Sequence, residues 1–212
     1  MGNLRPSGRI IARNIIKDDF LKDHLRLPTE WIDGLVIALD DDEDSRHSTD
    51  VAAFLYTLFK HYLKAADLKL HVERRPLFML NMDSTIRRPD LTICTQAATP
   101  DQPLSQPPEL IVEVVTSNSH RRDRVEKFLE YEAAGVPEYW IIDLECAEVV
   151  FYQRNSEGFY DIVAPDEAYV YHSQALSGLQ ISPDVFWQDE LPTPEEIVHL
   201  AQTMVKSANQ SA

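Results

Sequence analysis

Apolar residues follow two different spacings along the chain, and together these predict a mixed α/β fold. From Ser48, a suitable N-cap residue, to about Ala65 they recur every three or four positions, which is the pattern of a helix with one apolar face. The run from Leu110 to Val115 is almost continuously apolar, as expected for a central strand covered on both faces. Shorter apolar runs predict strands at residues 30–37 (a hairpin), 68–73, 77–82, 86–94, 139–144, 148–154, 160–163, 168–171 and 176–181.

Turn and capping residues define the remaining elements. Asp33-Gly34 is a favoured tight turn and would join the two strands of the hairpin. Gly135 follows a charged segment, where glycine commonly ends a helix. Further helices are expected after Asp18 or Asp19, at residues 121–134 and at residues 195–206.

The length of the chain fits a single α/β domain. Its 212 residues are enough to bury a substantial core, and no repeat or linker divides them. We expect one domain at residues 17–206, with a poorly ordered lead-in (1–16) and a polar tail (207–212). The chain has neither an apolar run near the roughly 20 residues of a membrane helix nor the apolar stretch of a signal peptide. Its two cysteines are too few for a disulfide framework, so we expect a cytoplasmic protein.

The charge of the chain limits how it can meet nucleic acid. A net charge of −15 argues against binding through the whole surface, because a phosphate backbone would be repelled. Eight of the 20 lysines and arginines nevertheless adjoin two carboxylate-bearing strands in the sequence. They form either a local basic groove or a scatter of solvated cations: Arg74, Arg75, Arg87, Arg88, Arg121, Arg122, Arg124 and Lys127.

Two carboxylates stand in or beside apolar runs, where charge is costly. Asp90 opens one run and Glu113 interrupts another. A buried acid needs a charged partner, hydrogen bonds or a metal ion. Mg²⁺ prefers hard oxygen ligands, often one or two carboxylates, and it assists phosphodiester hydrolysis by polarising phosphate and lowering the pKa of a bound water. Asp90, Glu113 and the carbonyl of Val114 could therefore bind Mg²⁺, for which Mn²⁺ could substitute.

The helix predicted at residues 121–134 brings a cation toward these acids. Asp123, Lys127 and Tyr131 are four residues apart and so lie along one side of it. Lys127 can then approach Glu113 and position or activate an attacking water. The alternative is a surface ion pair between Asp123 and Lys127. The side chains expected to pack on the sheet are Val125, Phe128 and Leu129.

Two other residues have open roles in the sequence. Arg88 could contact phosphate or pair with Asp90. His47 precedes the long helix, where a histidine is either a surface or capping residue or a functional one.

The order of these motifs resembles the Uma-two family, a group of proposed endonucleases. The resemblance covers about residues 17–190, and its most specific part is the ending Gly-Val-Pro-Glu-Tyr-Trp. The segments that carry it are Arg88-Pro89-Asp90, Pro108-Glu109-Leu110-Ile111-Val112-Glu113-Val114, Asp123-x-x-x-Lys127-x-x-x-Tyr131 and Gly135-Val136-Pro137-Glu138-Tyr139-Trp140-Ile141-Ile142-Asp143.

The resemblance implies the restriction-endonuclease-like fold of the PD-(D/E)xK superfamily, in which a mixed, strongly bent β-sheet is flanked by α-helices. Asp90 would be the motif aspartate and Glu113 the motif glutamate. Val115 stands where the superfamily normally has its lysine, and the family pattern implies that Lys127 replaces that lysine from the helix. Supporting roles would belong to Arg88, Asp123, Tyr131 and His47.

Three functions remain open at this point. The first is a metal-dependent endonuclease that cleaves DNA, and the resemblance also implies a homodimer, because such enzymes often cut duplex DNA as dimers. The second is a non-catalytic binding or assembly module that keeps the nuclease fold, which the acidic surface and the missing strand lysine favour. The third is a phosphodiesterase acting on a small nucleotide.

Overall fold

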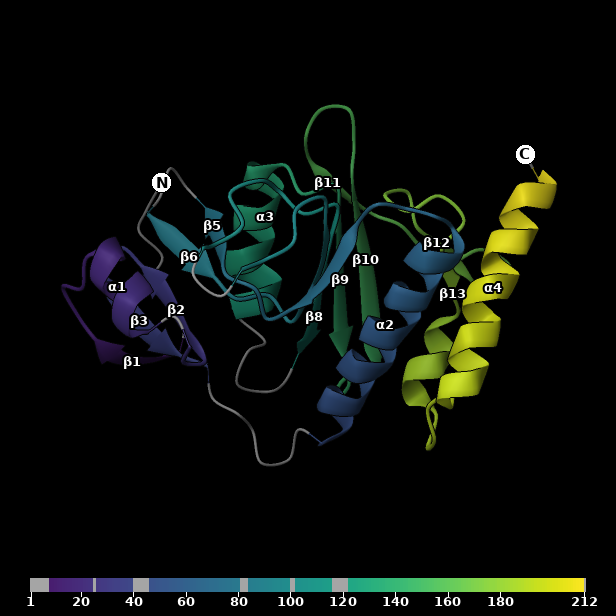
Figure 1. Cartoon of the computed structure of the whole chain (residues 1–212), viewed down its shortest axis with the longest axis horizontal. Coiled ribbons are helices and arrows are strands. Elements are labelled where there is room, and N and C mark those ends of the chain that lie inside the picture. The colour runs from purple at the N-terminus through teal and green to yellow at the C-terminus, as the bar shows by residue number, and fades with distance from the viewer. Residues whose placement is uncertain are drawn as a thin grey trace.

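A computed structural model describes residues 8–24, 26–39, 46–80, 84–99, 102–115 and 122–211 of the protein. These residues form two main β-sheets with helices packed around the larger one (Figure 1). No helix in this part of the chain is both long enough and apolar enough to cross a membrane.

The larger sheet passes through the middle of the molecule. Its spatial order is β11 (Tyr160–Ile162), β10 (Glu148–Arg154), β9 (Glu138–Asp143), β8 (Leu110–Val115), β7 (Leu91–Cys94) and β4 (His71–Arg74). β8 and β9 run parallel, and the other neighbouring strands are antiparallel. A parallel pair needs a crossover connection, and the chain between β8 and β9 supplies one that contains a helix.

The second sheet is antiparallel and brings the N-terminal part of the chain against the middle of the sequence. Its order is β1 (Arg9–Ala12), β3 (Leu35–Ala38), β2 (Thr29–Ile32), β6 (Thr85–Arg87) and β5 (Phe78–Leu80). Asp33 and Gly34 form the predicted turn, and both have positive φ (46° and 83°), as tight hairpins require. A separate short pair joins β12 (Tyr171–His172) to β13 (Gln180–Ile181).

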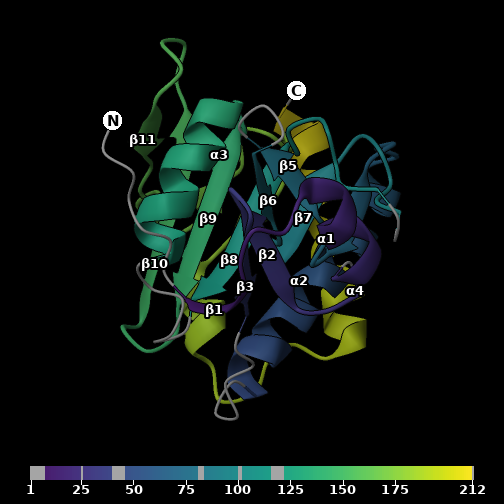
Figure 2. The same ribbon diagram turned by 90° about the vertical axis from the view of Figure 1, so that its left-hand side faces the viewer.

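Helices cover both faces of the larger sheet (Figures 1 and 2). α2 (Arg46–Ala65) and α4 (Pro194–Ser211) pack together on one face, whereas the π-helical segment η2 (Arg122–Lys127) and its continuation α3 (Phe128–Ala134) cover the other. α1 (Lys17–Asp23) packs through Phe20 against Trp31 of the smaller sheet. A 3₁₀ segment, η3 (Pro183–Trp187), precedes α4.

Alternation along β8 decides which core each residue enters. Leu110, Val112 and Val114 belong to the core under α2 and α4, whereas Ile111 and Val115 belong to the core under α3. Because successive side chains of a strand point to opposite faces, Glu113 also points toward η2 and α3.

The structure corrects several expected boundaries. Residues 86–94 are two strands in different sheets, β6 and β7, because Pro89 lacks the N–H that a continuous ladder needs. Residues 9–12 of the expected lead-in form β1, in which Ile10 pairs with Ile37 of β3. α2 begins at Arg46, so Ser48 is not its N-cap. α4 continues to Ser211, through most of the expected polar tail.

Candidate active site

Sheet register places the two predicted acids beside each other. β7 pairs with β8 so that Leu91 lies opposite Val112, and Asp90 therefore adjoins Glu113. The backbone N–H of Asp90 donates to Oε2 of Glu113 at 3.3 Å, and the N–H of Val114 donates to Oδ2 of Asp90 at 2.9 Å. The chain thus holds both carboxylates in fixed orientations at one end of the β7–β8 pair.

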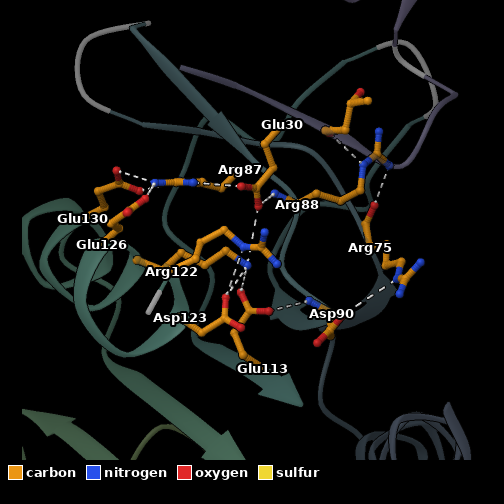
Figure 3. Close-up of polar contacts among 12 residues, drawn as sticks. Glu30, Arg75, Arg87, Arg88, Asp90, Glu113, Arg122, Asp123, Glu126 and Glu130 are labelled. Atoms are coloured by element: carbon orange, nitrogen blue, oxygen red, sulfur yellow. Dashed lines mark hydrogen bonds and ion pairs between the residues drawn. The ribbon is translucent and has the colours of Figure 1, made fainter. Parts of the chain in front are cut away.

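Helical residues complete the surroundings of Glu113. The Nζ of Lys127 donates to its Oε1 at 2.8 Å, and the hydroxyl of Tyr131 donates to the same oxygen at 2.9 Å. Lys127 also lies 3.0 Å from Oδ1 of Asp123, whose carboxylate lies next to that of Glu113 (Figure 3). The predicted approach of Lys127 to Glu113 is therefore confirmed, and Asp123 and Tyr131 are part of the same cluster.

The π-helical geometry of η2 directs polar side chains at the sheet. Asp123 and Lys127 are only 2% exposed and face Glu113. Val125 and Leu129 are instead 42% and 49% exposed, so the prediction that they pack on the sheet is wrong. Residues two apart do not share a helix face, and the sheet-facing side is occupied by the side chains that pair with Glu113. Phe128 does pack, against the rings of Tyr152 and Tyr160.

A buried ion-pair network lies behind Lys127. Glu30 of β2, which is 0% exposed, accepts from Arg87 at 2.8 Å and lies 3.5 Å from the Nζ of Lys127. Arg87 in turn pairs with Glu126 and Glu130 (Figure 3). Sequence reasoning missed Glu30 as a member of the site. The available signal was an acid inside the hairpin strand that precedes the Asp33-Gly34 turn.

Burial and neighbouring charges shift the ionisation of the cluster. Burial raises the pKa of Glu113, which Lys127 opposes and the nearby carboxylates of Asp123 and Asp90 reinforce. Burial likewise raises the pKa of Asp90. Burial acts to lower the pKa of Lys127, but Asp123, Glu113 and Glu30 outweigh it, and the net shift is upward. The ammonium of Lys127 is therefore held in its charged form.

Several expected phosphate-binding groups are already engaged by acids. Arg87 is buried among three glutamates, and Arg124 pairs with Asp143 and Glu148. The expectation of a groove built from all the nearby basic residues therefore fails for Arg87 and Arg124. Arg121 lies outside the described residues.

Two other predicted residues lie at different places. Arg88 donates through its guanidinium to the carbonyls of Thr29 and Arg75, while the ion pair with Asp90 comes from Arg75 at 3.7 Å. His47 lies in the first turn of α2, where its Nε2 contacts the carbonyl of Phe186 in η3 at 3.2 Å. This contact joins α2 to η3, on the opposite side of the sheet from η2.

The donor chemistry of the site suits a hard divalent cation. Glu113 and Asp90 present carboxylate oxygens, and Asp123 adds a third acid next to Glu113, against the single ammonium of Lys127. No group of three or more His, Cys, Asp or Glu side chains that could hold a metal by themselves occurs within the described residues. A cation bound here would need backbone oxygen and water in addition, which is how proteins usually bind Mg²⁺.

Comparison with solved structures shows a shared fold, which is consistent with the restriction-endonuclease-like fold that the motifs implied. The crystal structure of a protein from Anabaena variabilis ATCC 29413, titled a putative nuclease, matches with a TM-score of 0.60 and 14% sequence identity. The match covers 79% of this chain and 96% of that one. At this identity the similarity establishes the shared fold.

The sequence itself defines the family. The family model Uma2, described as "Putative restriction endonuclease", matches residues 21–190, and the chain belongs to this family. This is the Uma-two resemblance that the motifs indicated. No curated protein sequence matches the chain.

Proposed function

We propose that the protein is a metal-dependent nuclease that hydrolyses phosphodiester bonds in DNA. The observation that supports this function best is the convergence of Asp90, Glu113 and Lys127 from three separate segments at one end of the β7–β8 pair. Membership of the Uma2 family is consistent with a nucleic-acid substrate.

Asp90 and Glu113 would hold Mg²⁺ or Mn²⁺, together with the carbonyl of Val114. When bound, the ion would polarise the scissile phosphate and lower the pKa of a water molecule. The N–H of Val114 and the hydroxyl of Tyr131 keep the two carboxylates oriented without help from solvent.

Lys127 would supply the positive charge that the superfamily places on a strand. Its ammonium is fixed by Glu113, Asp123 and Glu30, so it need not lose side-chain freedom when substrate arrives. A fixed cation beside the reacting phosphate stabilises the charge that gathers on the phosphate oxygens in the transition state. Because its pKa is raised, Lys127 would orient the attacking water by hydrogen bonding rather than remove a proton from it.

A cleavage assay with Mg²⁺ or Mn²⁺ on duplex and single-stranded DNA tests this function. We expect Lys127→Met to lower the rate by about 10²–10³-fold, as for loss of one fixed donor that stabilises charge in the transition state. The exposed Asp184→Asn serves as a matched control for Asp90→Asn, which should abolish metal-dependent cleavage. Circular dichroism establishes that each variant is folded. Equal cleavage by wild type and folded Lys127→Met would remove Lys127 from the mechanism.

The alternative function is a non-catalytic binding or assembly module. It is favoured by one observation: Glu113 and Asp123 are already ion-paired with Lys127, and the three side chains are at most 3% exposed. Such a module would show neither stabilisation by Mn²⁺ nor DNA cleavage, and the same assays therefore separate the two functions.

A further inference from the structure

The acidic side chains of the candidate site that the structure describes differ in their exposure to solvent. The side chains of Glu113, Asp123 and Lys127 are 2%, 3% and 2% exposed, whereas that of Asp90 is 24% exposed. Of these four side chains, that of Asp90 is therefore the one a phosphate arriving from solvent would meet first.

Arg75 lies beside the carboxylate of Asp90. It follows β4, and its side chain is 51% exposed with Nε 3.7 Å from Oδ1 of Asp90. Its backbone N–H donates to the carbonyl of Asp90 at 3.0 Å, and its own carbonyl accepts from the guanidinium of Arg88 at 2.9 Å. The turn that carries Arg75 is thus tied on both sides to the segment that carries Asp90 (Figure 3).

The backbone of Arg75 adopts a conformation that is unfavourable for an arginine. Its φ of 48° lies in the left-handed region, which residues with a Cβ rarely adopt. Such a conformation persists where surrounding contacts enforce it, and it is concentrated at functional sites. Here two hydrogen bonds connect the backbone of Arg75 to residues 88–90, and its Nε lies beside the carboxylate of Asp90.

We propose that Arg75 is a substrate-binding residue that contacts a backbone phosphate of nucleic acid at the mouth of the site. Without substrate it is the counter-ion of Asp90; when Asp90 serves as a metal ligand, the guanidinium is released to bind phosphate. Arginine suits this role because its planar fork can donate two hydrogen bonds to phosphate oxygens. The inference rests on the proposed nuclease function for its substrate.

Arg74, the last residue of β4, provides a matched control beside Arg75. It has the same charge and is also exposed, but its guanidinium lies 6.0 Å from the centre of the Tyr56 ring of α2. α2 covers the opposite face of the sheet from Glu113. Arg74→Ala therefore removes one positive charge next to Arg75 without removing a group that faces Asp90.

Binding of a fluorescently labelled DNA duplex in Ca²⁺ tests the proposal, with the salt concentration varied. We expect Arg75→Ala to weaken binding at low salt and to reduce the slope of log K against log salt by about one, as for loss of one phosphate contact. Arg75→Lys should keep the slope and recover part of the affinity, whereas Arg74→Ala should match wild type. Stabilisation by Mn²⁺ should be unchanged or greater in Arg75→Ala, because a competitor for Asp90 is removed.

The outcomes separate this inference from the nuclease function. A wild-type slope in Arg75→Ala, or an equal effect of Arg74→Ala, overturns the role of Arg75 even if wild type cleaves DNA. If the slope is reduced in Arg75→Ala but wild type does not cleave DNA, the role of Arg75 in binding is supported and the nuclease function is excluded. No DNA binding by wild type overturns both.

Discussion

Buried acids differ in what satisfies them, and this difference marks the candidate site. Glu113 is 2% exposed and is held by an ammonium and a tyrosine hydroxyl, with two other acids close by. Glu138, which is 0% exposed, accepts five hydrogen bonds from uncharged donors instead. These donors are the side chains of Trp140, Tyr171 and Ser173 and the backbone N–H groups of Gln174 and Ala175. Glu138 thus stabilises a loop, whereas Glu113 lies in a crowded, charged cluster suited to a cation.

The buried carboxylate of Glu30 makes the free energy of unfolding depend on pH in the acid range. Burial raises its pKa, but Lys127, Arg87 and Arg122 together lower it from 4.5 to about 2. A carboxylate whose pKa is lower in the folded state contributes stability above its unfolded pKa, and this contribution is lost as the pH falls toward the folded value. We therefore expect the free energy of unfolding of wild type to fall between about pH 4.5 and pH 2 more steeply than that of Glu30→Gln.

Urea unfolding at a series of pH values measures both slopes. At neutral pH, Glu30→Gln should cost on the order of 3–5 kcal/mol, because it leaves buried cations short of a partner. The exposed Glu195→Gln in α4 serves as the control and should be close to wild type. Identical acid slopes in wild type and Glu30→Gln would show that Glu30 is not held as a buried anion.

At the scale of elements, the η2–α3 segment has reversed the usual arrangement of a surface helix. Its charged side faces the sheet, and Leu129 faces solvent. We expect Leu129→Ser to change the free energy of unfolding by no more than about 0.5 kcal/mol. Phe128→Ala should cost about 2–3 kcal/mol, because its ring lies 4.9 Å from that of Tyr152 and is partly buried. Chemical denaturation compares the two variants, and a larger effect of Leu129→Ser would contradict the orientation.

The sequence predicted elements well where one pattern dominated. The apolar run Leu110–Val115, the Asp33-Gly34 turn and Gly135 at the end of α3 all mark elements that the structure confirms. It failed where a tertiary contact decided the outcome. Residues 86–94 were predicted to be one strand, but β6 and β7 belong to different sheets. The spacing of apolar residues does not indicate that the chain passes from one sheet to the other at Pro89.

The candidate site was likewise predictable in part. Asp90 and Glu113 could be predicted because they are charged residues in or beside apolar runs. Lys127 could be predicted from its spacing along the helix and from the family pattern. Glu30 did not, because its partners Arg87 and Lys127 are 57 and 97 residues away along the chain. The face of η2 that packs on the sheet was predicted wrongly. Its polar side chains contact Glu113 there, while Val125 and Leu129 are exposed.

At the scale of the whole molecule, we expect metal binding to raise the free energy of unfolding. A ligand that binds only the folded state at about 100 times its Kd stabilises it by about 2.7 kcal/mol. For a chain of this length we therefore expect Mn²⁺ to raise the Tm by about 5–10 °C. The shift should grow with pH, because the raised pKa values of Asp90 and Glu113 mean that the ion must displace protons at lower pH. Differential scanning calorimetry on wild type and Asp90→Asn measures it, and an equal shift in both would exclude Asp90 as a ligand.

The break between β6 and β7 at Pro89 makes the position of Asp90 sensitive to substitutions in both sheets. Residues 88–90 are the joint at which the chain leaves the smaller sheet and enters the larger one, and Asp90 lies on that joint while Glu113 lies wholly in the larger sheet. The carboxylate of Asp90 accepts a hydrogen bond from Val114 of the larger sheet, whereas its backbone is joined through Pro89 to β6 of the smaller one. A substitution that displaces β6 would therefore move Asp90 relative to Glu113 and alter the binding of a cation without replacing either acid.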